Sequence, residues 1–248
     1  MSYSKIDHTI KAFHTQKDGN SPTEYEDHFI SNKENLAFAM ADGAADSVFS
    51  QQWASLLVDN FTRNPFDIGK TQEVFLNWLE PLQLQWRKEI NWKDLRWYVE
   101  EKARRGAFST FLALQIRDSQ PDETIDSVAI GDTCLFIIHD DKTTMFPEMN
   151  SSDFGNTPHL LCSYERYNTK ILPYLQTFNR TVGRGDLIIM ATDAFAKWLL
   201  EDSCDGKRSW SLFQDIDQPE FDQVISGLRE SKKIRNDDTT AIFIYFEY

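Results

Sequence analysis

The sequence predicts an α+β protein in which packed antiparallel sheets are covered by helices. Strand-like segments dominate the middle of the chain and both of its ends, whereas helical segments come in blocks between them. This segregation favours packed antiparallel sheets over an alternating β-α-β arrangement. Glycine and proline number only 10 and 8 and are scattered, and we find no linker or repeat, so we expect a single domain over residues 1–248.

The first strong strand signal covers residues 36–41 and ends at Asp42. Large apolar residues alternate there with Ala37 and Ala39, which is typical of a strand whose second face is tightly packed. Apolar residues then recur at helical spacing over residues 49–61, and Ser47 is the expected N-cap of that helix.

Two more helices are expected before the strand-rich middle of the chain. Residues 71–89 are amphipathic, and we expect Pro81 to kink or split this helix. Residues 93–105 form the next predicted helix, which Gly106 closes.

The middle of the chain consists of short segments rich in β-branched and aromatic residues. The predicted strands cover residues 108–116, 127–130, 134–139 and 143–146. Gly131-Asp132 and Asp140-Asp141 lie where tight hairpin turns are expected. The signal over 147–182 is weak and favours loop with some helix. The remaining elements are a strand at 187–192, helices at 195–201 and 221–231, and a last strand at 240–246.

Composition excludes several classes of protein. With 41% hydrophobic residues the chain has the apolar surface that disordered proteins lack. The 39 acidic and 26 basic side chains give a net charge of −13, which argues against nucleic-acid or anionic-membrane partners. No apolar run approaches the roughly 18 residues of a membrane span, and residues 1–17 show no signal peptide.

The three cysteines, Cys134, Cys162 and Cys204, fit neither a zinc site nor a disulfide framework. We therefore expect them to be core residues of a cytoplasmic protein.

The most informative feature of the sequence is the position of certain acidic residues. They lie where an apolar strand begins or ends, so that a sheet could bring them to one point. They are Glu26, Asp27, Asp42, Asp132, Asp193, Asp237 and Asp238. Carboxylates forced together repel one another unless a cation neutralises them, and oxygen ligands suit Mg²⁺ or Mn²⁺. The alternative is that each is an ordinary turn or capping residue.

The order of these motifs resembles that of the PPM (type-2C) metal-dependent Ser/Thr protein phosphatases. The resemblance extends over about residues 8–248. The motifs are Glu26-Asp27, Ala41-Asp42-Gly43, Gly106 to Thr110, Ile130-Gly131-Asp132-Thr133, Gly185-Asp186-Leu187 running to Ala191-Thr192-Asp193, and Asp237-Asp238-Thr239-Thr240.

The resemblance implies a four-layer α-β-β-α sandwich with two central antiparallel sheets flanked by helix pairs. It also implies a centre of two Mg²⁺ or Mn²⁺ ions at one end. By position, Asp42 would bridge the ions and Gly43 would offer its carbonyl. Glu26, with Asp27 beside it, would hold the first ion.

For the second ion the implied ligands are Asp193 and Asp237, beside Asp238. Asp132 matches a position that helps to hold a third, weaker ion in some members. The metal-activated water would hydrolyse a phosphate monoester, so the implied catalytic residues are Asp42, Asp193 and Asp237. The implied partner is a phosphorylated protein substrate or a regulatory protein.

Several positions depart from the family pattern. The glycine-rich turn after the bridging aspartate is Ala44-Ala45-Asp46 here, and many members carry a histidine at the Ala44 position. Pro22 stands where eukaryotic members have a phosphate-binding arginine, and Ala194 stands where the family has glycine. The substrate flap is expected to be reduced to part of 148–182.

These departures leave an alternative to the active enzyme. It is a pseudophosphatase of the same fold that binds a partner or a phosphorylated ligand without turnover. A purely structural acidic domain that binds no metal is a third hypothesis.

Overall fold

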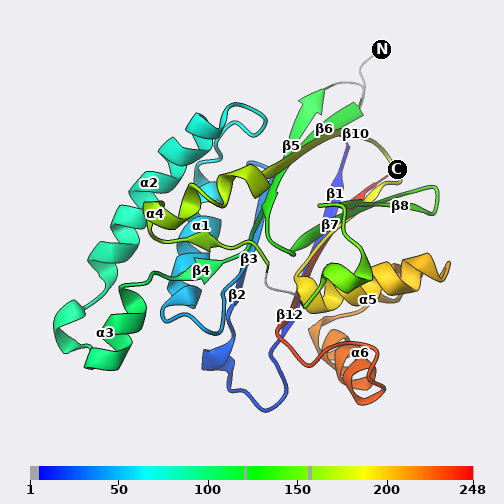
Figure 1. Cartoon of the computed structure of the whole chain (residues 1–248). Coiled ribbons are helices and arrows are strands. Elements are labelled where there is room, and N and C mark those ends of the chain that lie inside the picture. Colours follow the sequence, from blue (N-terminus) through cyan, green and yellow to red (C-terminus); the bar gives the residue numbers. More distant parts are fainter. Residues whose placement is uncertain (1–5, 120–121, 156–157, 248) are drawn as a thin grey trace.

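A computed structural model describes residues 6–119, 122–155 and 158–247, and two five-stranded antiparallel sheets form its centre (Figure 1). In spatial order the first sheet holds β1 (His8–Thr15), β12 (Thr239–Phe246), β11 (Leu187–Ala191), β7 (Cys134–His139) and β8 (Lys142–Phe146). The second holds β10 (Gln176–Val182), β6 (Asp122–Ile130), β5 (Phe111–Ser119), β3 (Ala37–Asp42) and β2 (Asp27–Asn32). Outside both sheets, β4 (Phe108–Ser109) pairs with β9 (Leu161–Cys162).

Helices cover the outer faces of both sheets, which confirms the four-layer sandwich (Figure 1). The α-helices are α1 (Ser50–Arg63), α2 (Gln72–Glu89), α3 (Trp97–Ala103), α4 (Glu165–Asn168), α5 (Asp193–Cys204) and α6 (Gln218–Glu230). Single 3₁₀ turns cover Pro22–Glu24, Trp92–Asp94, Ser151–Asp153, Leu172–Tyr174 and Ser209–Phe213. The helices α1 and α2 pack on the second sheet, and α5 and α6 pack on the first.

The alternation of side chains in the central strands explains this layering. In β3 the small residues Ala37 and Ala39 face α1, where Trp53 packs against them in one apolar cluster. Phe38 and Met40 point the other way, into the cluster between the two sheets. Each face of the strand is therefore buried, and the alanines allow the helix to approach the sheet closely.

Of the two predicted hairpin turns, the structure contains one. Gly131-Asp132 does not form a hairpin, because β6 and β7 belong to different sheets and the segment carries the chain across the sandwich. Gly131 has φ +100°, and a Cβ there would lie 2.6 Å from Cγ2 of Thr110. Asp140-Asp141 does form the tight turn between β7 and β8, with both φ angles positive (45° and 63°).

The predicted N-cap of the first helix is wrong. The helix α1 begins at Ser50, and its N-cap is Phe49, whose φ is 62°. The Ser47 hydroxyl instead donates to the Ala44 carbonyl at 3.0 Å and accepts from the Phe108 amide at 3.2 Å. Ser47 therefore ties the turn after β3 to β4.

The helix α2 continues through Pro81 without splitting. Leu79, Leu82 and Trp86 are buried in the α1 side of the core, so packing holds both halves of the helix although one backbone hydrogen bond is lost. The strands β1, β2 and β10 are not among the elements that the sequence predicts. All three are edge strands with few fully buried residues, so their apolar alternation is poor.

Cys134 and Cys162 are buried as expected, but Cys204 is exposed, which corrects its assignment to the core. None of the described helices is long and apolar enough to cross a membrane.

Candidate active site

Most of the predicted site residues meet at one end of the sandwich. Six of the eight line a single pocket of about 390 Å³, namely Glu26, Asp42, Gly43, Asp132, Asp193 and Asp237. They come from the residue before β2, the end of β3 and the residue after it, the connection after β6, the start of α5 and the segment before β12. Folding therefore brings residues as far apart in the sequence as Glu26 and Asp237, which are 211 positions apart, to the same pocket.

Hydrogen bonds fix the position of Asp42 at the end of β3. Its amide donates to the Thr110 hydroxyl at 2.8 Å. Its carbonyl accepts from the Ser109 hydroxyl at 2.8 Å and from the Thr110 amide at 2.9 Å. The strand pairing places Asp42 directly opposite Asp27. The carboxylate of Asp42 is thus held on rigid backbone.

Asp27 does not line the pocket. Its side chain is 2% exposed, and one carboxylate oxygen accepts from the Thr240 hydroxyl at 2.6 Å. The other oxygen, Oδ1, has no hydrogen-bond partner among the described groups. Burial raises the pKa of Asp27 well above its usual range, and the negative charges of Asp238 and Asp193 add to the effect.

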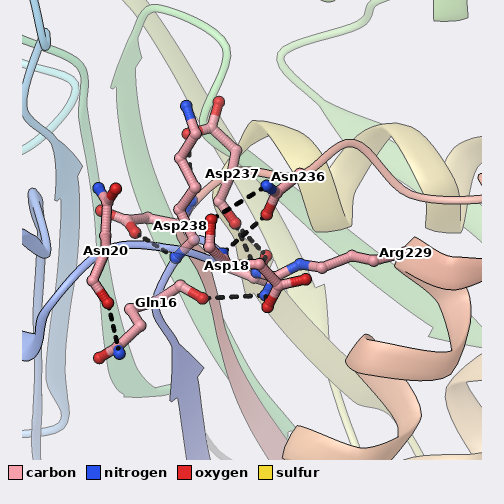
Figure 2. A network of polar contacts seen from close by, with 9 residues as sticks. Gln16, Asp18, Asn20, Arg229, Asn236, Asp237 and Asp238 are labelled. Carbon is pink, nitrogen blue, oxygen red and sulfur yellow. Dashed lines mark hydrogen bonds and ion pairs between the residues drawn. The ribbon is translucent and has the colours of Figure 1, made fainter.

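Asp238 also lies outside the pocket lining, and its carboxylate is engaged by the backbone. One oxygen accepts from the Lys17 amide at 2.8 Å, and the other accepts from the Glu26 amide at 2.7 Å. Figure 2 shows Asp238 beside the loop that follows β1. This pair of bonds joins the segment before β12 to the segment that carries Glu26.

Asp193 and Asp237 share a cation from the chain itself. The guanidinium of Arg235 bonds to the Asp193 carboxylate and lies 2.6 Å from the Asp237 carboxylate. Arg235 is the one basic residue among the described residues that line this pocket. Within the described ranges, no three His, Cys, Asp or Glu side chains are gathered closely enough to form a ready-made metal site.

The acidic side chains of the pocket strongly disfavour one another's charge. Burial, followed by the charges of neighbouring carboxylates, raises the pKa of Asp42 well above its usual range. The same causes raise the pKa of Glu26 and that of Asp132 to about 7. Burial also raises the pKa of Asp193, although Arg235 opposes the shift. A bound cation would relieve this repulsion.

A buried arginine that the sequence did not single out holds Asp237 in place. The side chain of Arg229, which is 5% exposed, donates to the Asp237 carbonyl at 2.6 Å and the Gln16 carbonyl at 2.9 Å (Figure 2). It also pairs with Asp18 at 2.8 Å. Arg229 lies in a helix with an amphipathic pattern, so no local signal distinguishes it from a solvated charge.

The turn after Asp42 accommodates its alanines without strain. Neither Ala44 nor Ala45 has a positive φ, and the Ala44 amide donates to the Phe108 carbonyl at 2.9 Å. Gly43 is needed for close approach, because a Cβ there would lie 3.1 Å from the Glu26 carbonyl oxygen.

The segment 148–182, where the flap is expected, contains positions 156 and 157, which lie outside the described residues. Its described part includes the sheet strand β10 and also Pro158 and Leu160, which line the pocket.

No protein-family model and no curated protein matches the sequence. Solved structures do match. The Ser/Thr phosphatase PstP/Ppp of Mycobacterium tuberculosis is similar at TM-score 0.64 with 13% identity, over 98% of this chain and 100% of that chain. The PstP catalytic domain in complex with two manganese ions gives TM-score 0.65, 13% identity and the same coverage. PppA of Pseudomonas aeruginosa is similar at TM-score 0.58 with 14% identity, over 96% of this chain and 97% of that chain.

Each similarity covers nearly the whole of this chain and of the matched chain. The sequence identities are low, so the similarities establish the fold alone. The fold that the resemblance implies is thus confirmed, and the chain has the fold of the PPM-type Ser/Thr phosphatases.

Proposed function

We propose that this protein is a metal-dependent phosphatase that hydrolyses phosphate monoesters on serine or threonine of a protein. The observation that carries the proposal is the single pocket that carboxylates from five separate segments line together with one arginine, which pairs with two of them. Phosphatases that use metal ions need such clustered oxygen ligands, together with positive charge for the phosphoryl oxygens. The fold shared with solved Ser/Thr phosphatases supports the choice of substrate.

The residues of the pocket fit a hard divalent cation such as Mg²⁺ or Mn²⁺. The donors are all oxygens, and mutual repulsion raises the pKa values of several of them. Asp27, directly opposite Asp42 in the strand pairing, adds a buried carboxyl oxygen that has no hydrogen-bond partner among the described groups. We assign the ligand role to Glu26, Asp42, the Gly43 carbonyl, Asp193 and Asp237, with Asp132 as a further, weaker ligand.

Two predicted ligands take supporting roles in this proposal. Asp27 lies outside the pocket lining, opposite Asp42 in the strand pairing, and a cation bound nearby would favour ionisation of its buried carboxyl group. Asp238 uses both oxygens to hold backbone amides and therefore positions Glu26.

Ions bound at such a site lower the pKa of a water and neutralise charge on the phosphoryl oxygens. The chain's own residues perform the rest of the task. Thr110 and Ser109 keep the Asp42 backbone fixed, and Arg229 keeps Asp237 fixed. Arg235, once released from the two carboxylates, is the guanidinium that can bind the phosphoryl group in two places. The small side chains of Ala44 and Ala45 leave room for the substrate.

Cysteine chemistry is a poor alternative at this site. Burial raises the pKa of Cys134 well above its usual range, with Asp132 adding to the effect, and burial raises that of Cys162 to about 12. Both thiols are therefore held in the unreactive protonated form. The exposed Cys204 does not line the pocket.

One observation favours the pseudophosphatase as a second candidate. The bond of Arg235 to both Asp193 and Asp237 neutralises the two proposed ligands of the second ion without any metal. If this pairing persisted in solution with metal present, the pocket would bind a partner or a phosphorylated ligand without turnover.

The experiment is a titration with Mn²⁺ or Mg²⁺, read by calorimetry and by hydrolysis of p-nitrophenyl phosphate. We expect binding and turnover, and we expect Asp42→Asn and Asp193→Asn to abolish turnover. The exposed Asp215→Asn serves as the matched control and should retain activity. Turnover that persists in excess chelator would refute the metal mechanism. Binding without turnover would identify the pseudophosphatase, and no binding would leave only the structural acidic domain.

A further inference from the structure

A second groove adjoins the acidic pocket on the side of α5 and α6. Its volume is about 680 Å³, and it shares Gly155, Asp193 and Arg235 with the lining of the acidic pocket. The other lining residues come from α5, from the end of α6, from the segment that leads to β12 and from Phe154. A peptide bound in the acidic pocket can therefore continue into this groove.

The charge of this groove is opposite to that of the pocket beside it. Its lining contains five basic and two acidic side chains, which are Lys197, Arg229, Lys232, Lys233 and Arg235, and Asp193 and Glu201. The described lining of the acidic pocket contains six carboxylates and one basic side chain. In a chain of net charge −13, the groove is a local positive region.

Three of these basic side chains are available to a ligand. Lys232 and Lys233 are exposed and Lys197 is partly exposed. In the part of the chain that the structure describes, none of the three forms an ion pair with a carboxylate. By contrast, Arg229 is buried and paired with Asp18.

The turn after α6 holds the two exposed lysines at the groove. The Lys232 amide donates to the Arg229 carbonyl at 2.9 Å, and the Lys233 amide donates to the Leu228 carbonyl at 2.8 Å. The next residue, Ile234, is 6% exposed and anchors the turn in the core below α5 and α6. The backbone of this positive site is thus ordered before any ligand arrives.

We propose that this groove binds an anionic residue of the substrate, a carboxylate or a second phosphate, a few positions from the phosphorylated serine or threonine. This inference rests on the proposed function and adds to it a preference for acidic or multiply phosphorylated segments. An extended peptide advances about 3.3–3.6 Å per residue, so a few residues are enough to pass from one hollow to the adjoining one. The positive charge of the groove then favours substrates with acidic or phosphorylated residues beside the phosphorylated serine or threonine.

The experiment compares three phosphopeptides that differ only in the flank, which is neutral, contains glutamates or contains a second phosphoserine. Each is assayed with Mn²⁺ for kcat and KM on the full chain and on the double variant Lys232→Gln/Lys233→Gln. The matched control is Lys88→Gln/Lys93→Gln, which removes two exposed lysines near the end of α2, in the helix layer on the opposite sheet. Labelled peptides also report binding by fluorescence anisotropy, which needs no turnover.

We expect the groove variant to raise KM for both anionic peptides by about 3- to 10-fold, with kcat and p-nitrophenyl phosphate hydrolysis unchanged. The control variant and the neutral peptide should show no such change, and the preference should shrink at high salt. A response to only one of the two anionic flanks would identify the source of the negative charge. Hydrolysis of p-nitrophenyl phosphate with equal KM for all three peptides would refute the groove while the proposed function stands. Charge-dependent binding in anisotropy without hydrolysis would support the groove and reject the phosphatase.

Discussion

Arg235 provides the sharpest test of how the negative charges of the acidic pocket are neutralised. Its guanidinium bonds to Asp193 and Asp237, both proposed ligands of one cation. A cation that binds both carboxylates competes with these ion pairs. We therefore predict that Arg235→Met destabilises the metal-free protein and strengthens its binding of Mn²⁺.

The size of the effect follows from the exposure of the three side chains. The Arg235 side chain is 46% exposed, whereas those of Asp193 and Asp237 are 9% and 36% exposed. Breaking a buried pair costs about 3–5 kcal/mol and an exposed pair about 0–1 kcal/mol, so this half-exposed pair should contribute about 1–2 kcal/mol. In a chain of this size, that lowers Tm by about 2–8 °C. The apparent Mn²⁺ affinity should rise by up to about 5- to 30-fold.

Thermal denaturation in chelator measures the first effect, and calorimetric titration with Mn²⁺ measures the second. The matched control is Arg63→Met on α1, which removes an exposed arginine that pairs with Asp59 at 3.2 Å. It should change neither quantity appreciably. If Arg235→Met left the Mn²⁺ affinity unchanged or weakened it, the idea that Arg235 competes with the cation would be wrong.

Three further predictions concern the same end of the sandwich. Asp42→Asn should raise Tm in chelator because it removes one of several mutually repelling carboxylates, and it should reduce the Tm gain on adding Mn²⁺. The stability of the chelated protein should fall as pH rises from about 4 to about 7. The raised pKa values of Glu26 and Asp132, both about 7, favour their protonated forms in the folded state, and that advantage is lost as they ionise. Gly131→Ala should lower stability by about 1–3 kcal/mol, because φ is +100° and the new Cβ would lie 2.6 Å from Thr110.

Each of these predictions has a result that contradicts it. A less stable Asp42→Asn protein in chelator would mean that the Asp42 carboxylate is favourably paired. A Tm that is constant or rises over that pH range would show that the carboxylates ionise freely. A Gly131→Ala protein of unchanged Tm would show that the turn relaxes at no cost.

The central strands could be predicted because their signal is local. In β3 the alternation of alanines with Phe38 and Met40 identifies a strand with a close-packed face, and the structure confirms both faces. The edge strand β10 carries no such alternation, since its side chains are mostly solvated. The hairpin predicted at Gly131-Asp132 is wrong because a sequence does not reveal which sheet the next strand joins.

The candidate site also has a part that the sequence predicts and a part that only the structure shows. Acidic residues at strand ends pointed to one cluster, and six of the eight predicted residues do line one pocket. Sequence alone could not separate Asp238, which binds backbone amides, from Asp237, which faces the pocket. Nor could it identify Arg235 as the basic residue of the pocket, because the partner of a charged side chain is set by residues far away in the chain.

The sequence by itself determined the kind of chemistry available, through acidic residues at the ends of apolar strands in a recognisable order. Tertiary structure alone decided how those charges are balanced. It places Arg235 between Asp193 and Asp237, and it sets a groove with Lys232 and Lys233 beside the acidic pocket. The physical reason is that strand periodicity is a local property of the chain, whereas electrostatic balance depends on distances between segments that only folding brings together.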